Sequence, residues 1–361
     1  MPDKIRPLVL LGGGHAHIEV LRRAAREPFP LPLVLIEPHP ALPYTGMVPG
    51  YVAGCYALDD ILIDLDRLCE RAGVTRIAAR ACALDPAART VTCDDGRIVP
   101  YERLSIDVGS TLDLGVPGAV DHTLAVRPLW RFVERWQQRR AQAQRIVVVG
   151  AGAAGIELAF ALRAAASAAT VTVIGDARRP LHGWPAAAQS RIERRCRERD
   201  VTLMLGTRVR EVTPDAVMLT EGRSVAADAV IWATGPRAPG WLKTTGLPLA
   251  MGDDLAVDTT LRVAGHPSIF AAGDVASIIG HPRPKAGVFA VRAASALEHN
   301  LRAALGGRPL GHYRPQRQAL ALLGTGDGRA VGTWGGLTVE GRWVWGWKRA
   351  IDTRFVARYR E

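Results

Sequence analysis

The chain has 361 residues, which at roughly 150 residues per domain predicts two to three domains. Its 48% hydrophobic and 22% charged residues are globular averages, and they argue against disorder, collagen or a coiled coil. No run of 18 uncharged apolar residues occurs, and the apolar run before the first glycines is too short for a secretory signal. We therefore expect no transmembrane helix, and a cytoplasmic location.

The five cysteines are scattered, odd in number and never arranged as CxxC. This pattern disfavours a disulfide scaffold or a zinc ribbon and favours a reducing compartment. We predict no metal site.

Positive charge is concentrated at the C-terminal end. The formal net charge is +11, and residues 302–361 hold eleven Lys and Arg against four Asp and Glu. The helix-turn-helix, finger and RNA-reading signatures of nucleic-acid binders do not occur, so no nucleic-acid partner is predicted. A basic tail beside an anionic membrane surface is the functional interpretation, and a solvated face is the alternative.

A pattern of strand, glycine turn, helix and strand occurs twice, each time within about thirty residues. The first copy has a strand at 7–11, the turn Gly12-Gly13-Gly14-His15-Ala16-His17, a helix to about Arg26 and a strand at 31–37. The second has a strand at 145–149, the turn Gly150-Ala-Gly152-Ala-Ala-Gly155, a helix and a strand at 171–175. The duplication predicts an α/β fold with two Rossmann-like dinucleotide-binding domains.

Each glycine of such a turn has a physical role. The first permits the tight turn, the second lets backbone amides reach a pyrophosphate at the helix N-terminus, and the third lets helix and strand pack closely. An acid about 20 residues further on binds the ribose hydroxyls. The first copy has this acid, Glu37, but carries His17 in place of the third glycine, whereas the second has all three glycines and Gly175 where the acid is expected.

The residues after Gly175 bear on cofactor choice. Asp176 in the role of the acid would favour NADH, whereas Arg178 and Arg179 would suit the 2′-phosphate of NADPH. The sequence leaves both alternatives open.

Three further motifs accompany the glycine turns. Ile106-Asp-Val-Gly109-Ser110 lies between the two turns, and Ile231-Trp-Ala-Thr-Gly235 and Ile269-Phe-Ala-Ala-Gly273-Asp274 follow the second. With the two turns they make the chain, over roughly residues 5 to 305, resemble the flavoproteins of the pyridine nucleotide-disulfide oxidoreductase superfamily. Within it the chain looks most like the single-flavin NADH:quinone and sulfide:quinone oxidoreductases. Segments 44–50 and 284–292 resemble a branch often fused to selenophosphate synthetase.

The resemblance implies FAD at the first turn and NADH or NADPH at the second. It assigns FAD contacts to Gly12, Gly14, His15, Ala16, Glu37, Gly109, Asp274 and Ala286, and nicotinamide dinucleotide contacts to Gly150, Gly152, Gly155, Asp176, Arg178 and Gly235. The residues alone place Asp274 at the carboxyl edge of a parallel sheet, where ligands bind, or make it a helix N-cap. For His15 and His17 a packed or exposed ring is the alternative to a cofactor contact, and His17 is too large for a close crossing of helix and strand.

Lys285 is the candidate catalytic residue. It precedes a predicted helix at 287–305 in a chain with four lysines, and a compact charge there would stabilise the N1–C2=O edge of a reduced flavin. A solvated surface lysine is the alternative. Disulfide-reducing members of the superfamily carry a redox cysteine pair, whereas the corresponding regions here hold only Cys55 and only Cys196, so no redox disulfide is predicted.

The tail places Trp347, Ile351, Phe355 and Tyr359 four residues apart. This spacing predicts an amphipathic helix with the basic residues largely elsewhere. A membrane contact through residues 340–361 and packing on the FAD domain or in a homodimer are the two interpretations.

We predict a discontinuous FAD-binding domain made of residues 1–112 and 242–315, an NAD(P)-binding domain of residues 113–241 and a tail of residues 316–361. The predicted function is hydride transfer from NAD(P)H to FAD and electron transfer to a quinone. The alternatives are an oxidoreductase for sulfur or selenium species that needs no nicotinamide, and a non-enzymatic flavin-binding partner of a selenium-pathway protein.

Overall fold

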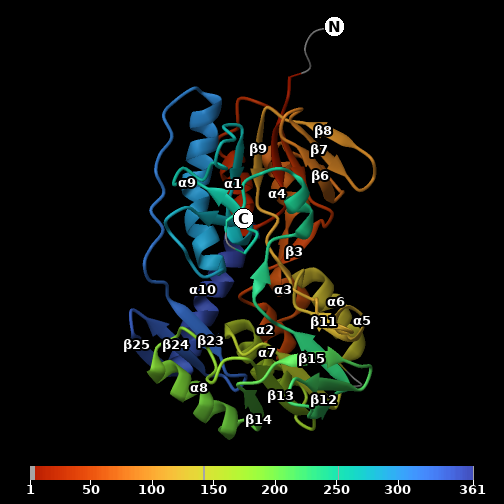
Figure 1. Cartoon of the computed structure of the whole chain (residues 1–361). Helices are drawn as coiled ribbons and strands as arrows, with labels where there is room; N and C mark the ends of the chain where they lie inside the picture. The colour runs from red at the N-terminus through yellow and green to blue at the C-terminus, as the bar shows by residue number, and fades with distance from the viewer. Residues whose placement is uncertain (1–4, 141–142, 251, 361) are drawn as a thin grey trace.

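The computed structural model describes residues 5–140, 143–250 and 252–360. Within them, two five-stranded parallel sheets form the cores of two α/β units, and a three-stranded sheet and a long helix form the tail (Figure 1). The predicted fold class is confirmed.

The first sheet has the strand order β21-β9-β1-β2-β5, and every adjacent pair is parallel. Its strands are β1 (Leu8–Leu11), β2 (Leu33–Ile36), β5 (Thr75–Ile77), β9 (Arg103–Ile106) and β21 (Ile269–Ala271). All four residues of the central strand β1 are buried, as expected for a strand covered on both faces. Helix α1 (His15–Ala24) joins β1 to β2 and packs against α9 (Gly287–Leu305), beside which it lies in Figure 1.

The second sheet repeats the first, with the order β11-β18-β12-β13-β14, again all parallel. Its strands are β11 (Thr123–Ala125), β12 (Arg145–Val149), β13 (Thr170–Gly175), β14 (Val201–Leu205) and β18 (Ala229–Trp232). Helix α7 (Ala153–Ala165) joins β12 to β13 as α1 joins β1 to β2. The short strands β10 (Thr111–Leu112) and β19 (Pro236–Arg237) pair with each other where the chain enters and leaves this unit.

Each unit also carries a three-stranded antiparallel sheet. In the first unit its strands are β6 (Ala81–Asp85), β7 (Thr90–Cys93) and β8 (Ile98–Pro100), and in the second β15 (Val209–Val212), β16 (Ala216–Leu219) and β17 (Ser224–Ala226). The remaining elements before the tail are β3 (Ala41–Pro43), α2 (Val48–Val52), α3 (Leu58–Ile61), β4 (Leu62–Asp64), α4 (Leu65–Ala72), α5 (Ala119–His122), α6 (Leu129–Arg139), α8 (Ala186–Glu198), η1 (Gly240–Thr244), β20 (Leu255–Val257), η2 (Gly273–Val275) and β22 (Ala276–Ile278).

The tail forms an antiparallel sheet and then the helix α10 (Arg342–Arg360), which packs against that sheet and against α3 and β4 of the first unit. The strands of this sheet are β23 (Ala321–Gly324), β24 (Ala330–Trp334) and β25 (Leu337–Gly341). Among the described residues, no helix has both the length and the apolar character needed to cross a bilayer.

The predicted apolar stripe of α10 is wrong in detail. Trp347 and Ile351 are 42% and 40% exposed, whereas Tyr359 is buried. Because an α-helix has 3.6 residues per turn, each four-residue step advances by about 40°, so the four positions wind about 120° around the helix.

The buried face of α10 carries charge, because Lys348 and Asp352 are both buried. The Lys348 ammonium is buried, 2.8 Å from an Asp352 carboxylate oxygen and 3.6 Å from the Glu157 carboxylate of α7, and it donates to the Gly46 carbonyl at 2.7 Å. Burial alone would lower the pKa of Lys348, but Glu157 and Asp352 hold it above its ordinary value. One ammonium thus ties the tail to both units.

We expect Lys348→Met to lower the free energy of unfolding by about 3 kcal/mol, because two carboxylates then stay buried without their cation. Urea unfolding followed by tryptophan fluorescence measures this. The matched control is Arg354→Met at an exposed position of the same helix, which should change stability by less than about 0.5 kcal/mol. Equal effects of the two substitutions would contradict the tying role of Lys348.

Candidate functional site

The two glycine turns have the same backbone constraint. Gly12 has φ +91° and Gly150 has φ +118°, a region that disfavours side chains. A Cβ at Gly12 would lie 2.6 Å from the Asp107 carbonyl oxygen, and one at Gly150 would collide with the Ala233 carbonyl. Each turn therefore crosses the end of a neighbouring strand, β9 or β18, with no room for a side chain.

The third position of the motif differs between the turns. A Cβ at Gly155 would collide with the Gly150 carbonyl, so helix and turn touch through backbone there. The equivalent His17 is fully buried, and its Nδ1 lies 2.7 Å from the Gly12 carbonyl oxygen while its Nε2 lies 2.8 Å from Ser105 Oγ. Since a carbonyl only accepts, Nδ1 carries the proton and Nε2 accepts from the serine hydroxyl. His17 thus packs, fully hydrogen-bonded, where α1 crosses the strands. The expectation that its side chain is too large for a close crossing of helix and strand is wrong.

Glu37 lies where the ribose acid is expected, directly after β2. Its carboxylate accepts hydrogen bonds from the backbone amides of Gly13 at 3.0 Å and His39 at 3.1 Å. Burial raises the pKa of Glu37, although the two amides oppose this shift.

Asp107, at the carboxyl end of β9, is a cavity residue that the glycine motifs do not predict. Its carboxylate is buried and accepts hydrogen bonds from the backbone amides of Ala16 at 2.8 Å and His17 at 3.2 Å. The rule that drew attention to Asp274, an acid at the carboxyl edge of a parallel sheet, would also have found Asp107.

Asp274 lies in η2 at the same edge of the sheet and is held by two partners. Arg127 forms an ion pair with it at 2.9 Å, and the Ser110 hydroxyl donates to it at 3.4 Å. Nearby, desolvation lowers the pKa of His15 to about 4, with Asp274 opposing the shift and Arg127 adding to it. His15 is therefore neutral at pH 7.

A long cavity runs along the carboxyl edge of the first sheet. It encloses about 1800 Å³, including its open mouth, and is lined by the first glycine turn, Glu37, Asp107, Gly109, Arg127, Asp274 and Gly287, among others. Its lining comes from the ends of several strands, so an extended ligand would contact all of them at once. Of the residues assigned to FAD, Gly12, Gly14, His15, Glu37, Gly109 and Asp274 line this cavity.

One wall of the cavity is aromatic and rests on the tail. Tyr44 and Thr45 line the cavity, and the Tyr44 ring stacks on Phe355 of α10 with ring centroids 4.4 Å apart. Lys348 holds the carbonyl of the neighbouring Gly46. The sequence motif at 44–50 gave no sign that α10 covers it.

The residues assigned to the nicotinamide dinucleotide lie at the carboxyl edge of the second sheet. Asp176 and Arg178 are exposed just after β13, and Gly235 is exposed after β18. The Arg179 guanidinium donates to both oxygens of Glu193, at 2.8 Å each. Only Arg178 of the arginine pair thus lacks a carboxylate partner among the described residues.

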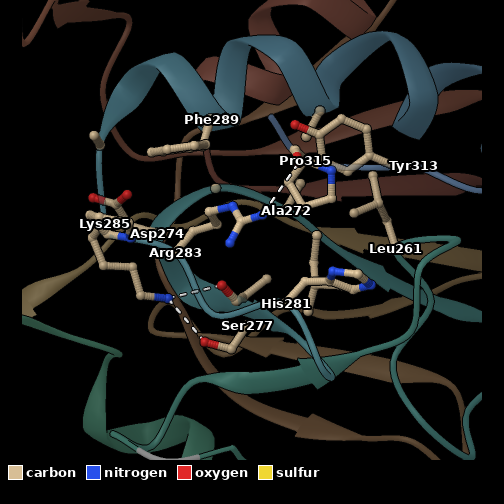
Figure 2. Close-up of a pocket in the computed structure, with 17 residues that line it drawn as sticks. Leu261, Ala272, Asp274, Ser277, His281, Arg283, Lys285, Phe289, Tyr313 and Pro315 are labelled. Atoms are coloured by element: carbon tan, nitrogen blue, oxygen red, sulfur yellow. Dashed lines mark hydrogen bonds between the residues drawn. The ribbon is translucent and has the colours of Figure 1, made fainter. Parts of the chain in front are cut away.

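Lys285 and Ala286 line a second, smaller pocket rather than the long cavity. Figure 2 shows the Lys285 side chain directed toward Ser277, and its ammonium lies 2.6 Å from the Asp254 carboxylate and 2.9 Å from the Ala276 carbonyl. The structure therefore gives Lys285 a buried ion pair in place of the expected free charge at a flavin edge. The predicted helix at 287–305 is confirmed, and its residue Gly287 does line the long cavity.

The arrangement fits FAD. The Gly12–Gly14 turn excludes side chains beside the helix N-terminus, and two carboxylates, Glu37 and Asp274, lie in one cavity at the positions expected for ribose and ribitol hydroxyls.

The comparisons with known proteins agree with this geometry. The family model described as pyridine nucleotide-disulphide oxidoreductase matches residues 6–294. The chain belongs to this family. Its members bind FAD and NADH or NADPH, the cofactor pair that the motifs predicted.

Relatives and structural neighbours include NADH- and quinone-linked proteins. An NADH dehydrogenase-like protein of Mycobacterium tuberculosis is 33% identical over 226 residues, which are 57% of this chain and 56% of that relative, so the chain matches about half of its length. The sulfide:quinone oxidoreductase of Aquifex aeolicus superposes with a TM-score of 0.83 at 22% identity, covering 98% of this chain and 91% of that one. NDH2 of Plasmodium falciparum, solved with NADH, gives 0.80 at 13% identity, covering 99% and 98%. These two show the fold alone, and the resemblance to the selenophosphate synthetase branch stays a prediction.

Burial of the neutral His17 ring makes stability pH-dependent. Burial lowers the pKa of His17 to about 4 from 6.5, so the unfolded chain binds more protons between these values and stability falls as the pH drops through them. We expect the stability difference between wild type and His17→Asn to shrink by roughly 2 kcal/mol from pH 7 to pH 4.5. Urea unfolding across this range measures it. His182→Asn, at an exposed position, should follow the wild type, and parallel wild-type and His17→Asn curves would contradict the assignment.

Proposed function

We propose that this protein takes hydride from NADH onto FAD and passes the electrons to a quinone. The observation that carries the proposal is the long cavity, which joins Glu37, the first glycine turn and the Asp274–Arg127 pair along one sheet edge. FAD would lie in it, with its adenosine ribose at Glu37, its pyrophosphate at the N-terminus of α1 and its ribitol at Asp274. When bound, FAD supplies the hydride acceptor.

Charged groups of the chain would set the electrostatic potential in this cavity. The N-terminus of α9, through Gly287, lies in the cavity wall and supplies the positive potential that was expected from Lys285. Arg127 also places a positive charge in the cavity wall, but this charge is paired with the Asp274 carboxylate.

The second glycine turn would bind the nicotinamide dinucleotide. A Cβ at Gly152 meets nothing within 4 Å, so the N-terminus of α7 is open to a pyrophosphate. Arg179 forms an ion pair with Glu193, so only one of the two arginines is left to bind a 2′-phosphate. This favours NADH over NADPH, with Asp176 binding the ribose hydroxyls.

The positions of the cysteines fit direct electron transfer from the flavin to a small acceptor. None of the five cysteines is among the described residues that line the long cavity, which supports electron transfer from the flavin without a protein disulfide. A quinone is the proposed acceptor because a sequence relative, 26% identical over 262 residues, is the type II NADH:quinone oxidoreductase of Haemophilus influenzae.

An exposed apolar edge on the tail would bring the cavity to a membrane. We name Trp343, Trp347 and Ile351 the tryptophan edge of α10; they are 59%, 42% and 40% exposed, and the two indoles stack. Arg342, Arg349 and Arg354 of the same helix are exposed as well. Indole rings next to arginines suit the interface of an anionic bilayer. We propose that the tryptophan edge contacts such a membrane surface.

Anaerobic titration of the flavin-loaded protein tests the reaction. NADH should bleach the yellow flavin with one equivalent, and NADPH should do so at least about tenfold less efficiently, because a 2′-phosphate would face Asp176. Re-oxidation by a soluble quinone then completes the cycle. No bleaching with either nucleotide would contradict the proposal and favour the sulfur or selenium alternative or a non-enzymatic role.

Variants at Gly152 separate nucleotide binding from flavin binding. The open space admits Gly152→Asp without a clash, yet its carboxylate would repel a pyrophosphate at the N-terminus of α7. We expect normal flavin content and at least about tenfold weaker NADH binding. Gly152→Asn, of equal size but uncharged, is the control and should weaken NADH binding less than Gly152→Asp does.

Co-sedimentation with liposomes tests the tryptophan edge. Wild-type protein should bind vesicles containing anionic lipid, and the triple variant Trp343→Ser/Trp347→Ser/Ile351→Ser should bind at least about tenfold less. Ile98→Ser, at an equally exposed apolar side chain of β8, is the matched control. Equal binding of all three proteins would refute the membrane contact, and a wild-type dimer that the triple variant loses would assign the edge to a second copy.

A further inference from the structure

The two glycine turns differ in what faces the N-terminus of their helices. The residue whose carbonyl contacts the first glycine is Asp107 in the first unit and Ala233 in the second. A Cβ at Gly14 would collide with the Asp107 carboxylate, whereas a Cβ at Gly152 meets nothing within 4 Å. One helix N-terminus is therefore filled by a carboxylate, and its structural counterpart is open.

The Asp107 carboxylate takes the role of a helix cap. Ala16 and His17 are the second and third residues of α1, and their amides are the ones that an N-cap side chain normally binds. Gly14, at the N-cap position itself, has no side chain to do so. Asp107 supplies the cap from the neighbouring strand, at the end of the helix where a dinucleotide phosphate binds.

We propose that FAD binding is coupled to the uptake of one proton by Asp107, because its ionised carboxylate and the FAD phosphates compete for the first-turn amides of α1. The inference rests on the proposed function, which places FAD at this turn. The proton comes from solvent and ends on an Asp107 carboxylate oxygen, and the cofactor itself is unchanged.

The charges around Asp107 support the coupling. Asp274 is the acid that acts on it from η2, and Arg127 partners Asp274. On α1 the rings of His15 and His17 are neutral, and Glu37 accepts a hydrogen bond from the Gly13 amide. Burial raises the pKa of Asp107 to about 7, with Asp274 adding to the shift. Bound phosphates would raise it further, so proton uptake accompanies binding above about pH 7.

Release of FAD from the full-length holoprotein on dilution, followed by the recovery of flavin fluorescence between pH 6 and 9, tests the coupling. In the wild type the dissociation constant should rise by up to about tenfold per pH unit above pH 7. Asp107→Asn keeps the hydrogen-bond acceptor and the size but cannot ionise, so its dissociation constant should be flat over this range. Glu298→Gln removes a buried carboxyl of α9 that does not line the cavity, and should keep the wild-type slope.

The outcomes are distinct. A wild-type dissociation constant that is equal at pH 6 and pH 9, or an Asp107→Asn variant that keeps the slope, overturns the inference while leaving the proposed function standing. Failure of the wild type to hold FAD at any pH overturns both.

Ala233→Asp provides a second test that does not depend on how Asp107→Asn folds. It places the same acid at the open N-terminus of α7, and NADH binding should become weaker as the pH rises from 6 to 9 while FAD retention keeps the wild-type profile. An unchanged pH profile of NADH binding in this variant would count against the competition between carboxylate and phosphate.

Discussion

At each of the two nucleotide turns, the backbone passes so close to the end of a neighbouring strand that a Cβ cannot fit. This contact brings β1 against β9 and β12 against β18, and it fixes where each following helix begins. Because strands of a parallel sheet end at one edge, the same contact gathers Glu37, Asp107 and Asp274 in one cavity, although they are far apart in the sequence. The candidate site is a consequence of this one steric constraint.

The two copies show how the constraint can be met with different chemistry. Where the second copy uses Gly155, the first uses a buried imidazole that bridges the Gly12 carbonyl and Ser105. Where the second copy has Ala233, the first has Asp107. Both replacements put polar side chains under the first turn, and burial holds the histidine neutral while it raises the pKa of the acid. The first turn thus packs against the hydrogen-bonded His17 and the titratable Asp107, where the second packs against Gly155 and Ala233.

The tail supports one wall of the long cavity through direct contacts with the 44–46 segment. Phe355 backs Tyr44, and Lys348 binds Gly46 while it neutralises Asp352 and Glu157. A buried ammonium between two carboxylates is stable only when all three are present, so α10, α7 and the 44–46 segment are locked together. The exposed tryptophan edge lies on the same helix, with Trp347 about 100° around the helix axis from Lys348, so any surface that α10 meets is linked to the cavity wall.

Sequence alone determined the features with strong local signals: the two strand-turn-helix units, the long helix at 287–305, the place of Glu37 directly after the second strand, and the family. These depend on glycine spacing and apolar periodicity, which act within about thirty residues. Only the tertiary structure placed Asp107 on the α1 amides, the Lys285 ammonium on Asp254, Arg179 on Glu193 and Lys348 in the core. Each of these is a charge whose partner lies in another element, and a sequence pattern does not contain the distance between elements. The same reason explains the tail, where a four-residue repeat predicted the helix correctly but its burial was decided by the surfaces that α10 packs against.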